Sequence, residues 1–242
     1  MEKMEKMTQY KLADKNRPIR LGIDLDGVIF DFELKAKIEF EKKGVIFDSV
    51  EDMCEKIKKD ESLMTIYKEI YHTPGFYANL PTIAGAIEAF KKLDNLCDAK
   101  GHKLFKVYIV STASHLNETC PLDKFKDIKL HFGIDVVDRI YLCRDKTLVG
   151  MDILVDDMLN VVGENGSSEF LTRRIIEKSP RKKKIDPKKR NEMSFIHIRF
   201  RSPFYIYSTD EYYEIIDNWT DGSYLDKIIS AAYDFDLLES VD

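Results

Sequence analysis

The sequence predicts an α/β fold in which a doubly wound parallel sheet carries a small helical cap inserted after the first core strand. Short apolar runs typical of buried strands alternate with amphipathic helical segments, and this alternation predicts a parallel, right-handed sheet. The segment between the first two strand-like runs is mostly helical in pattern, which predicts the cap. The chain has 242 residues, 44% of them hydrophobic, which is enough to fill the core of such a domain.

The first predicted core strand is the apolar run at 19–24, which lacks the alternation of a strand with one solvated face. Helical periodicity follows in FELKAKIEFEKKG, which Gly44 ends, and in ESLMTIYKEIYH. We therefore assign three parts to this region of the chain: a polar lead-in at 1–18, a core at 19–31 and 79–163, and a helical cap at 32–78.

The remaining core elements alternate in the same way. AGAIEAFKKLDNL predicts a helix, KVYIVSTAS the second strand, PLDKFKDIKLHFG another helix, RIYLC the third strand and DILVDD the fourth. FIHIRF predicts one more strand, and EYYEIIDNW predicts a short helix around Trp219. Residues 195–242 are therefore expected to complete the core and to end in an acidic tail.

The net charge of −5 conceals a strongly basic segment, because residues 171–190 hold ten Lys and Arg against Glu177 and Asp186. Residues 164–194, which contain this segment, are predicted to form a mobile basic insertion. The four cysteines form no CxxC pair, and no apolar run approaches the ~20 residues needed to span a bilayer. These features predict a cytoplasmic protein without membrane contact, with a nuclear location as the alternative that the basic segment raises.

Polar residues follow four predicted strands at the point where each strand ends. Ligands of doubly wound sheets bind outside the carboxyl ends of the strands, so these residues are expected to meet in one site. A single pair of acids would be weak evidence, but the order of acid pair, hydroxyl, cation and acid pair is specific. The residues are Asp24 and Asp26, then Ser111 and Thr112, then Arg144 and Lys146, then Asp156 and Asp157.

With these motifs the sequence resembles the haloacid dehalogenase (HAD-like) superfamily of phosphohydrolases, and within it the 5'(3')-deoxyribonucleotidases. The resemblance is carried by DLDGVIFDF, GFYANLPTIAGAIEAF, TCPLDKFKDIKLHFG and RIYLCRDKTLVGMDILVDD, and more weakly by HIRFRSPF. It covers residues 19–163 and resumes near 195–219. It implies a HAD-type Rossmann-like core, a phosphatase that acts on nucleoside monophosphates, and a cap that helps to form the base pocket.

The chemistry of the residues agrees with this resemblance. Asp24 is expected to attack phosphorus and form an aspartyl phosphate, while Asp26 protonates the leaving oxygen and later deprotonates the attacking water. Crowded acids need a cation, and Mg²⁺ prefers oxygen ligands, so we place it between Asp24, the main-chain carbonyl of Asp26 and Asp156. Asp157 is the second choice as a ligand. Lys146 is expected to offset the charge of the nucleophile and the phosphate.

Ser111 and Thr112 are expected to bind phosphate oxygens, and Arg144 to bind the phosphate or the nucleotide. Phe32 and Phe76 occupy positions that match the family's base pocket, where aromatic rings stack on bases. Ser111-Thr112-Ala113 departs from the Thr-Ser-Pro run usual in the branch, and the cap segment has no tryptophan.

Other functions remain open at this point. The site could serve a phosphatase of another small ester, such as a sugar phosphate, or pass phosphate to an acceptor other than water. The basic segment could bind nucleic acid, although a single basic run without aromatic residues is more typical of a solvated loop. The expected partner is a small nucleotide substrate, and a homodimer is a further alternative.

Overall fold

A six-stranded parallel sheet forms the centre of the computed structural model, which describes residues 10–14, 17–158, 195–205 and 215–241. The strand order is β4-β3-β2-β5-β6-β7, and each neighbouring pair is parallel. The doubly wound parallel fold is therefore confirmed. Its strands are β2 (Ile19–Ile23), β3 (Phe105–Ser111), β4 (Ile140–Leu142), β5 (Ile153–Asp156), β6 (Ile196–Phe200) and β7 (Ile215–Ile216).

Strand β2 lies between β3 and β5. The chain adds β3 and β4 on one side of β2 and then β5, β6 and β7 on the other side, so the order of strands reverses between β2 and β5. Its sequence IRLGI is buried except for Arg20, as expected of a strand with helices on both faces. In this class of fold the reversal point opens a crevice at the carboxyl ends of the strands. The residues that follow β2 and β5 are therefore placed where a ligand would bind.

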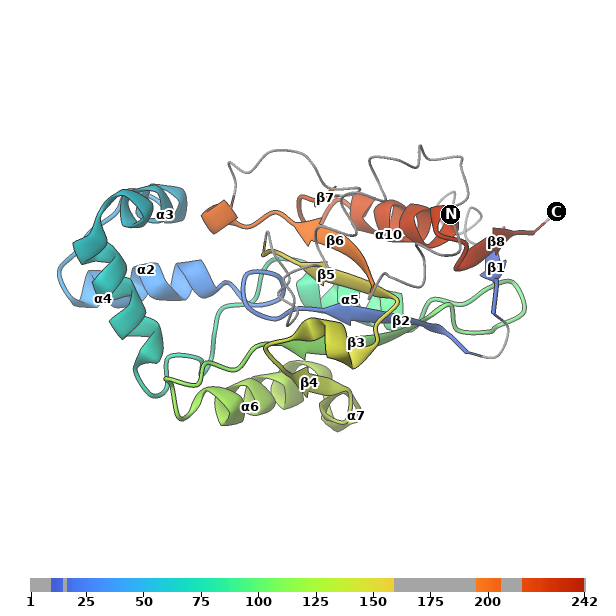
Figure 1. The fold of residues 1–242 in the computed structure, drawn as a ribbon, viewed down its shortest axis with the longest axis horizontal. Coiled ribbons are helices and arrows are strands. Elements are labelled where there is room, and N and C mark those ends of the chain that lie inside the picture. Colours follow the sequence, from blue (N-terminus) through green and yellow to red (C-terminus); the bar gives the residue numbers. More distant parts are fainter. Residues whose placement is uncertain (1–9, 15–16, 159–194, 206–214, 242) are drawn as a thin grey trace.

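Three helices gather beyond the carboxyl end of β2, at the left of Figure 1. They lie within the segment predicted as the cap, and the division of the chain into cap and core stays a prediction. Asp31 begins the first of them, because its Oδ1 accepts a hydrogen bond from the Leu34 amide at 3.0 Å. The three helices are α2 (Phe32–Lys42), α3 (Val50–Lys59) and α4 (Glu61–His72).

The other helices flank the sheet, with α10 on one side of it and α6 on the other in Figure 1. Helices α5 and α6 agree with the predicted helical runs. Helix α10 presents a buried apolar face, including Leu225 and Ile228, and so contributes core to the C-terminal segment. These helices are α5 (Ala86–Asp94), α6 (Cys120–Phe132), α7 (Ile134–Val137) and α10 (Ser223–Asp234).

One prediction near the C-terminal end of the chain needs correction, and the N-terminal end forms a strand. The segment at 1–18, predicted as a polar lead-in, contains β1 (Tyr10–Leu12), which pairs antiparallel with β8 (Leu238–Ser240) at the end of the molecule opposite α2, α3 and α4 (Figure 1). The helix predicted around Trp219 is wrong for the described part, because Ile215–Ile216 forms strand β7 beside β6. Two β-branched residues at a sheet edge outweigh the weak helical pattern of this short run.

Trp219 nevertheless has a structural role. Its ring is buried against Phe200, and its Nε1 donates a hydrogen bond to the Val28 carbonyl at 2.7 Å. This bond ties the C-terminal segment to the loop that follows β2. The basic segment at 171–190 lies outside the described residues. Within the described ranges, no helix is long and apolar enough to cross a membrane.

Candidate functional site

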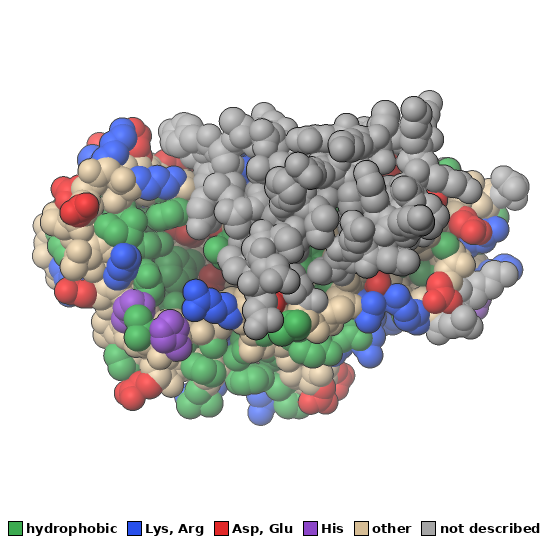
Figure 2. Space-filling model, viewed as in Figure 1, with side chains coloured by type: hydrophobic (Ala, Val, Ile, Leu, Met, Phe, Trp, Pro, Cys, Tyr) green, Lys and Arg blue, Asp and Glu red, His purple; other side chains and the backbone are tan. Residues whose placement is uncertain are grey.

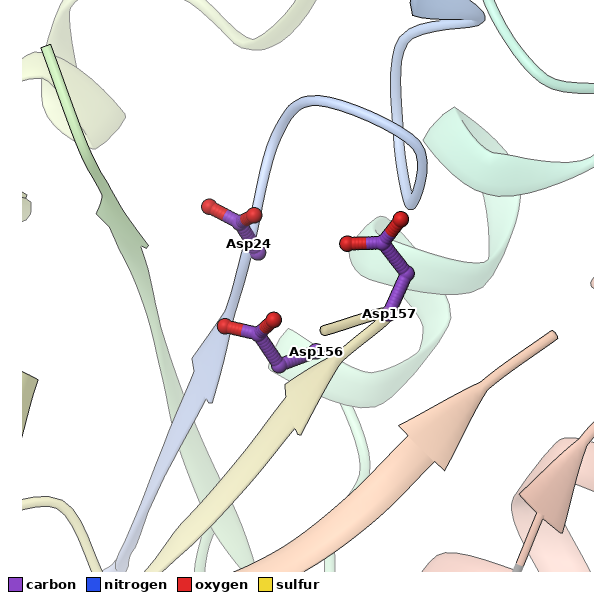
Figure 3. Close-up of side chains that lie close together, drawn as sticks. All are labelled: Asp24, Asp156 and Asp157. Atoms are coloured by element: carbon purple, nitrogen blue, oxygen red, sulfur yellow. The ribbon is translucent and has the colours of Figure 1, made fainter. Parts of the chain in front are cut away.

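Three aspartates meet at the reversal point of the sheet. Asp24 follows β2 directly, Asp156 is the last residue of β5, and Asp157 comes next. Each offers a carboxylate oxygen within 4.8 Å of the other two, and all three residues are buried. Figure 3 shows their carboxyl groups turned toward one shared space. Adjacent parallel strands with acids at their carboxyl ends produce this convergence.

The aspartate cluster has the donor chemistry of a divalent metal site. Three carboxylates held this close repel one another unless a cation lies among them, and hard cations prefer such oxygen ligands. Burial raises the pKa of Asp157 well above its usual value, and the Asp156, Glu33 and Asp24 carboxyls raise it further. Asp157, the second choice from the sequence, thus joins Asp24 and Asp156 in the cluster. The side chain of Asp26 lies outside it.

Gly27 allows the Asp157 carboxylate to approach the loop after β2. A Cβ at this position would lie 2.5 Å from Asp157 Oδ2, and the backbone has a φ of +74°. Both the contact and the left-handed backbone exclude an ordinary side chain. Glycine is therefore required at position 27, where the loop that carries Asp24 and Asp26 faces Asp157.

Lys146 is the cation inside the cluster. Its Nζ lies 3.0 Å from Asp24 Oδ1 and donates to Asp156 Oδ2. Burial lowers the pKa of Lys146, but Asp156 and Asp24 outweigh that effect and raise it, so the ammonium stays charged. Burial also raises the pKa of Asp156 to about 6, against the opposing effect of Lys146. One ammonium against three carboxyl groups leaves negative charge for a metal to neutralise.

Lys124 is a functional candidate that the sequence reasoning missed. It lies on α6, is 1% exposed, and donates from Nζ to Asp26 Oδ2 at 2.7 Å. The same ammonium donates to Ser111 Oγ at 2.9 Å and to the Thr112 carbonyl at 2.8 Å. A signal did exist, because Lys124 lies four residues from both Cys120 and Ile128 and so shares their buried helix face.

Asp26 therefore has a defined orientation and a perturbed acidity. Burial raises the pKa of Asp26, Lys124 lowers it, and the Asp24 charge raises it. The net effect is an increase, which favours a protonated carboxyl at a higher pH than an ordinary aspartate would allow. Such a carboxyl can carry a proton to and from a reacting oxygen.

The predicted phosphate-binding residues divide into two groups. Ser111, at the end of β3, and Thr112 line the same cavity as Asp24 and Lys146. Thr112 also donates from Oγ1 to the Cys143 carbonyl at 3.2 Å, which fixes its side chain. Arg144 is exposed and is not among the residues that line this cavity. The structure thus places the Ser111 and Thr112 hydroxyls in the cavity wall, whereas Arg144 lies outside the cavity.

A cavity of about 440 Å³ lies over the aspartates, a volume typical of small-molecule sites. Figure 2 shows hydrophobic side chains gathered in a hollow beside α2, α3 and α4 at the left. Besides the polar residues near the sheet, the cavity wall includes five aromatic side chains and a methionine: Phe32, Tyr67, Tyr71, Tyr77, Phe204 and Met64.

Phe32 and Phe76, the two residues predicted for the base pocket, lie together, but only Phe32 lines the cavity. Their ring centroids are 5.1 Å apart, and Phe76 is buried. Phe204 was not predicted; it stacks on Tyr67 of α4 with centroids 5.9 Å apart. It belongs to the 3₁₀ turn η3 (Pro203–Tyr205) after β6, so this contact joins α4 to a segment distant in the sequence.

Comparison with known proteins agrees with this geometry. The family model described as "5' nucleotidase, deoxy (Pyrimidine), cytosolic type C protein" matches residues 17–196. A protein of Acanthamoeba polyphaga mimivirus named "Putative 5'(3')-deoxyribonucleotidase R824" is 44% identical over 223 residues, covering 92% of this chain and 95% of the relative. The human cytosolic-type 5'(3')-deoxyribonucleotidase is 28% identical over 161 residues, covering 61% of this chain and 75% of the relative.

Among solved structures, a hydrolase from Pseudomonas syringae covers 88% of this chain and 99% of its own, with a TM-score of 0.43 and 13% identity. That score is too low to support an argument about function. The family assignment depends instead on the family match, which spans most of the sequence, and on the mimivirus relative. The chain belongs to this 5' nucleotidase family, the deoxyribonucleotidase branch of the HAD-like phosphohydrolases, and is therefore a phosphoric monoester hydrolase.

Proposed function

We propose that the protein catalyses Mg²⁺-dependent dephosphorylation of nucleoside monophosphates, 2'-deoxyribonucleotides above all, to nucleoside and phosphate. The observation that carries this proposal is the convergence of Asp24, Lys146 and the Asp156–Asp157 pair beneath a cavity with an aromatic wall. The polar end suits a phosphate and the aromatic end suits a base. The names of the relatives support the choice of deoxyribonucleotides as substrates.

In the proposed first step, Asp24 attacks phosphorus and the ester bond to the leaving oxygen breaks. Asp26 gives its proton to that oxygen, so the nucleoside leaves as a neutral alcohol. In the second step Asp26 takes a proton from water, whose oxygen attacks the aspartyl phosphate and releases inorganic phosphate with Asp24 restored. The raised pKa of Asp26 suits this exchange, because the carboxyl must be protonated in the first step and ionised in the second.

Asp24, Asp156 and Asp157 fit Mg²⁺ as a donor set, with the main-chain carbonyl of Asp26 as the further ligand predicted from the sequence. When bound, the ion would neutralise the charge that the acids and the phosphate bring together. Lys146 would hold the nucleophile and a phosphate oxygen from the other side. Ser111 and Thr112 would bind the remaining phosphate oxygens.

In this proposal α2, α3 and α4 act as the cap, and Phe32 and its aromatic neighbours in the cavity wall receive the base. A cytosolic location fits the four free cysteines and the cytosolic-type human relative. The homodimer, and nucleic-acid binding or nuclear targeting by residues 171–190, stay predictions.

The test is phosphate release from a panel of deoxyribonucleotides, ribonucleotides and sugar phosphates, with Mg²⁺ and with a chelator. We expect metal-dependent release that favours deoxyribonucleotides. Asp24→Asn should abolish turnover with the fold intact, and Asp26→Asn should slow it about 10²- to 10⁴-fold. Asp48→Asn, an exposed aspartate of the cap segment, is the matched control.

Three outcomes would count against the proposal. Release confined to sugar phosphates would transfer the function to the general phosphatase. Substantial turnover by Asp24→Asn would remove Asp24 as the nucleophile. Full activity in the chelator would remove the metal from the mechanism.

A further inference from the structure

Glu33 is a buried carboxyl group in the cavity wall that the proposed mechanism does not use. It lies in the first turn of α2, next to Phe32, and is 5% exposed. Its Oε2 has no hydrogen-bond partner among the described residues. A buried polar oxygen without a partner is costly, so a ligand that supplies a donor would be bound favourably.

The nearby charged groups do not supply that donor. Among the described residues, Lys58 is a cation that acts on Glu33, but its ammonium donates to the Phe204 carbonyl and lies 4.8 Å from the centre of the Phe204 ring. The other nearby charged groups, Asp31, Asp26 and Asp157, are acids. The group that satisfies Glu33 is therefore expected to come from the ligand in the cavity.

The position of Glu33 indicates which part of a nucleotide it would meet. On one side it shares the cavity wall with Asp26 and Asp157, which mark the phosphate end of the cavity. On the other side it adjoins Phe32, where the aromatic wall begins. In a nucleotide the sugar lies between phosphate and base, so the sugar would lie opposite Glu33.

We propose that Glu33 accepts a hydrogen bond from the single free hydroxyl of the deoxyribose, and so favours substrates that carry this hydroxyl. The inference rests on the proposed nucleotidase function and deepens it. A deoxyribonucleoside monophosphate has one free hydroxyl whether the phosphate is on the 5' or the 3' oxygen. One carboxyl group at this distance from the phosphate could therefore serve both kinds of ester.

The test compares thymidine 5'-monophosphate with its 2',3'-dideoxy counterpart, which lacks only that hydroxyl. Glu33→Met removes the acceptor and keeps the length of the side chain, whereas Glu33→Gln keeps a carbonyl oxygen. Glu41→Met, at an exposed position of the same helix, is the matched control. p-Nitrophenyl phosphate, which has no sugar, reports the phosphate chemistry alone.

We expect the wild-type enzyme to prefer the deoxy substrate in kcat/KM by about 10- to 100-fold, since the dideoxy compound leaves Glu33 unpaired. Glu33→Met should abolish this preference, Glu33→Gln should retain most of it, and Glu41→Met should behave as the wild type.

Two results would overturn the inference, and they can be told apart. If Glu33→Met lowers kcat/KM equally for both nucleotides, the preference is unchanged and Glu33 does not contact the hydroxyl. If the wild type hydrolyses p-nitrophenyl phosphate but neither nucleotide, the proposed nucleotidase function fails and the inference fails with it.

Discussion

Replacing Lys124 by methionine tests how the enzyme holds its proposed acid–base residue. The substitution keeps the length and apolar stem of the side chain but removes an ammonium with three acceptors. These are Asp26 Oδ2 at 2.7 Å, Ser111 Oγ at 2.9 Å and the Thr112 carbonyl at 2.8 Å. All three belong to the segments that we propose bind and cleave the phosphate ester, so both stability and catalysis should respond.

The expected loss of stability follows from the burial of the pair. Removing one partner of a buried ion pair typically costs about 3–5 kcal/mol. The Asp26 side chain is 23% exposed, so water can replace part of the lost pairing, and we expect the lower end of that range. A loss of about 3 kcal/mol corresponds to a decrease in Tm of about 6–12 °C for a chain of this size.

The loss should also depend on pH. Burial raises the pKa of Asp26 and Lys124 opposes the rise, so the pKa should be higher still without the ammonium. A carboxyl whose folded pKa exceeds its unfolded value of about 3.9 stabilises the fold at low pH and loses that contribution as pH rises through the folded pKa. The deficit of Lys124→Met should therefore shrink as the pH falls from about 8 to about 5.

Urea unfolding at the two pH values measures the deficit, and initial rates at the same values measure turnover. Lys126→Met, an exposed position on the same helix, is the control and should change neither. A Lys124→Met enzyme with wild-type stability and an unchanged pH–rate profile would refute the reasoning, because Asp26 would then not depend on the ammonium.

Three further predictions concern Gly27 in the loop after β2, the ion pairs of Asp152, and Trp219 in the C-terminal segment. Gly27→Ala should displace the Asp157 carboxylate, which would lie 2.5 Å from the new Cβ, and raise the Mg²⁺ concentration for half-maximal activity about 10- to 100-fold in a metal titration. Asp152→Asn should lower the free energy of unfolding by about 1–2 kcal/mol at neutral pH. Burial raises the pKa of Asp152, but hydrogen bonds from Arg17 and Arg20 outweigh burial and lower the pKa. The stability that the Asp152 carboxylate contributes should therefore disappear in urea titrations as the pH falls through the folded pKa, below about 4. Trp219→Phe should cost about 1–3 kcal/mol of unfolding free energy in thermal or urea melts, because the Val28 carbonyl loses its donor.

Each of these has an outcome that contradicts it. Gly44→Ala is the control for Gly27→Ala, because it has a similar φ of +82° but no atom within 4 Å of the new Cβ. An equal metal requirement in both variants would rule out the contact with Asp157. For Asp152→Asn, a loss of unfolding free energy that persists below about pH 3 would show that the ionised carboxylate is not its cause. A Trp219→Phe protein as stable as the wild type would show that water replaces the lost hydrogen bond.

The sequence was sufficient where a feature is local or follows from the order of elements. A strand such as β2 is recognisable because its residues are continuously apolar, and Asp24 is at its end by adjacency alone. The alternation of strands and helices predicts a parallel sheet, and such a sheet brings the residues that end its strands to one edge. The order of elements therefore suffices to place Asp24, Ser111, Lys146 and Asp156 in one site.

Tertiary structure alone decided which side chains contact these residues. The helical spacing of Lys124 places it on a buried face of α6, but only the tertiary packing brings its ammonium to Asp26 and Ser111. Glu33 and Phe204 share one cavity although they come from opposite ends of the chain. Conversely, Phe76 matches a family motif but lies outside that cavity. Contacts between distant segments depend on the packing of whole elements, and sequence spacing carries no record of that packing.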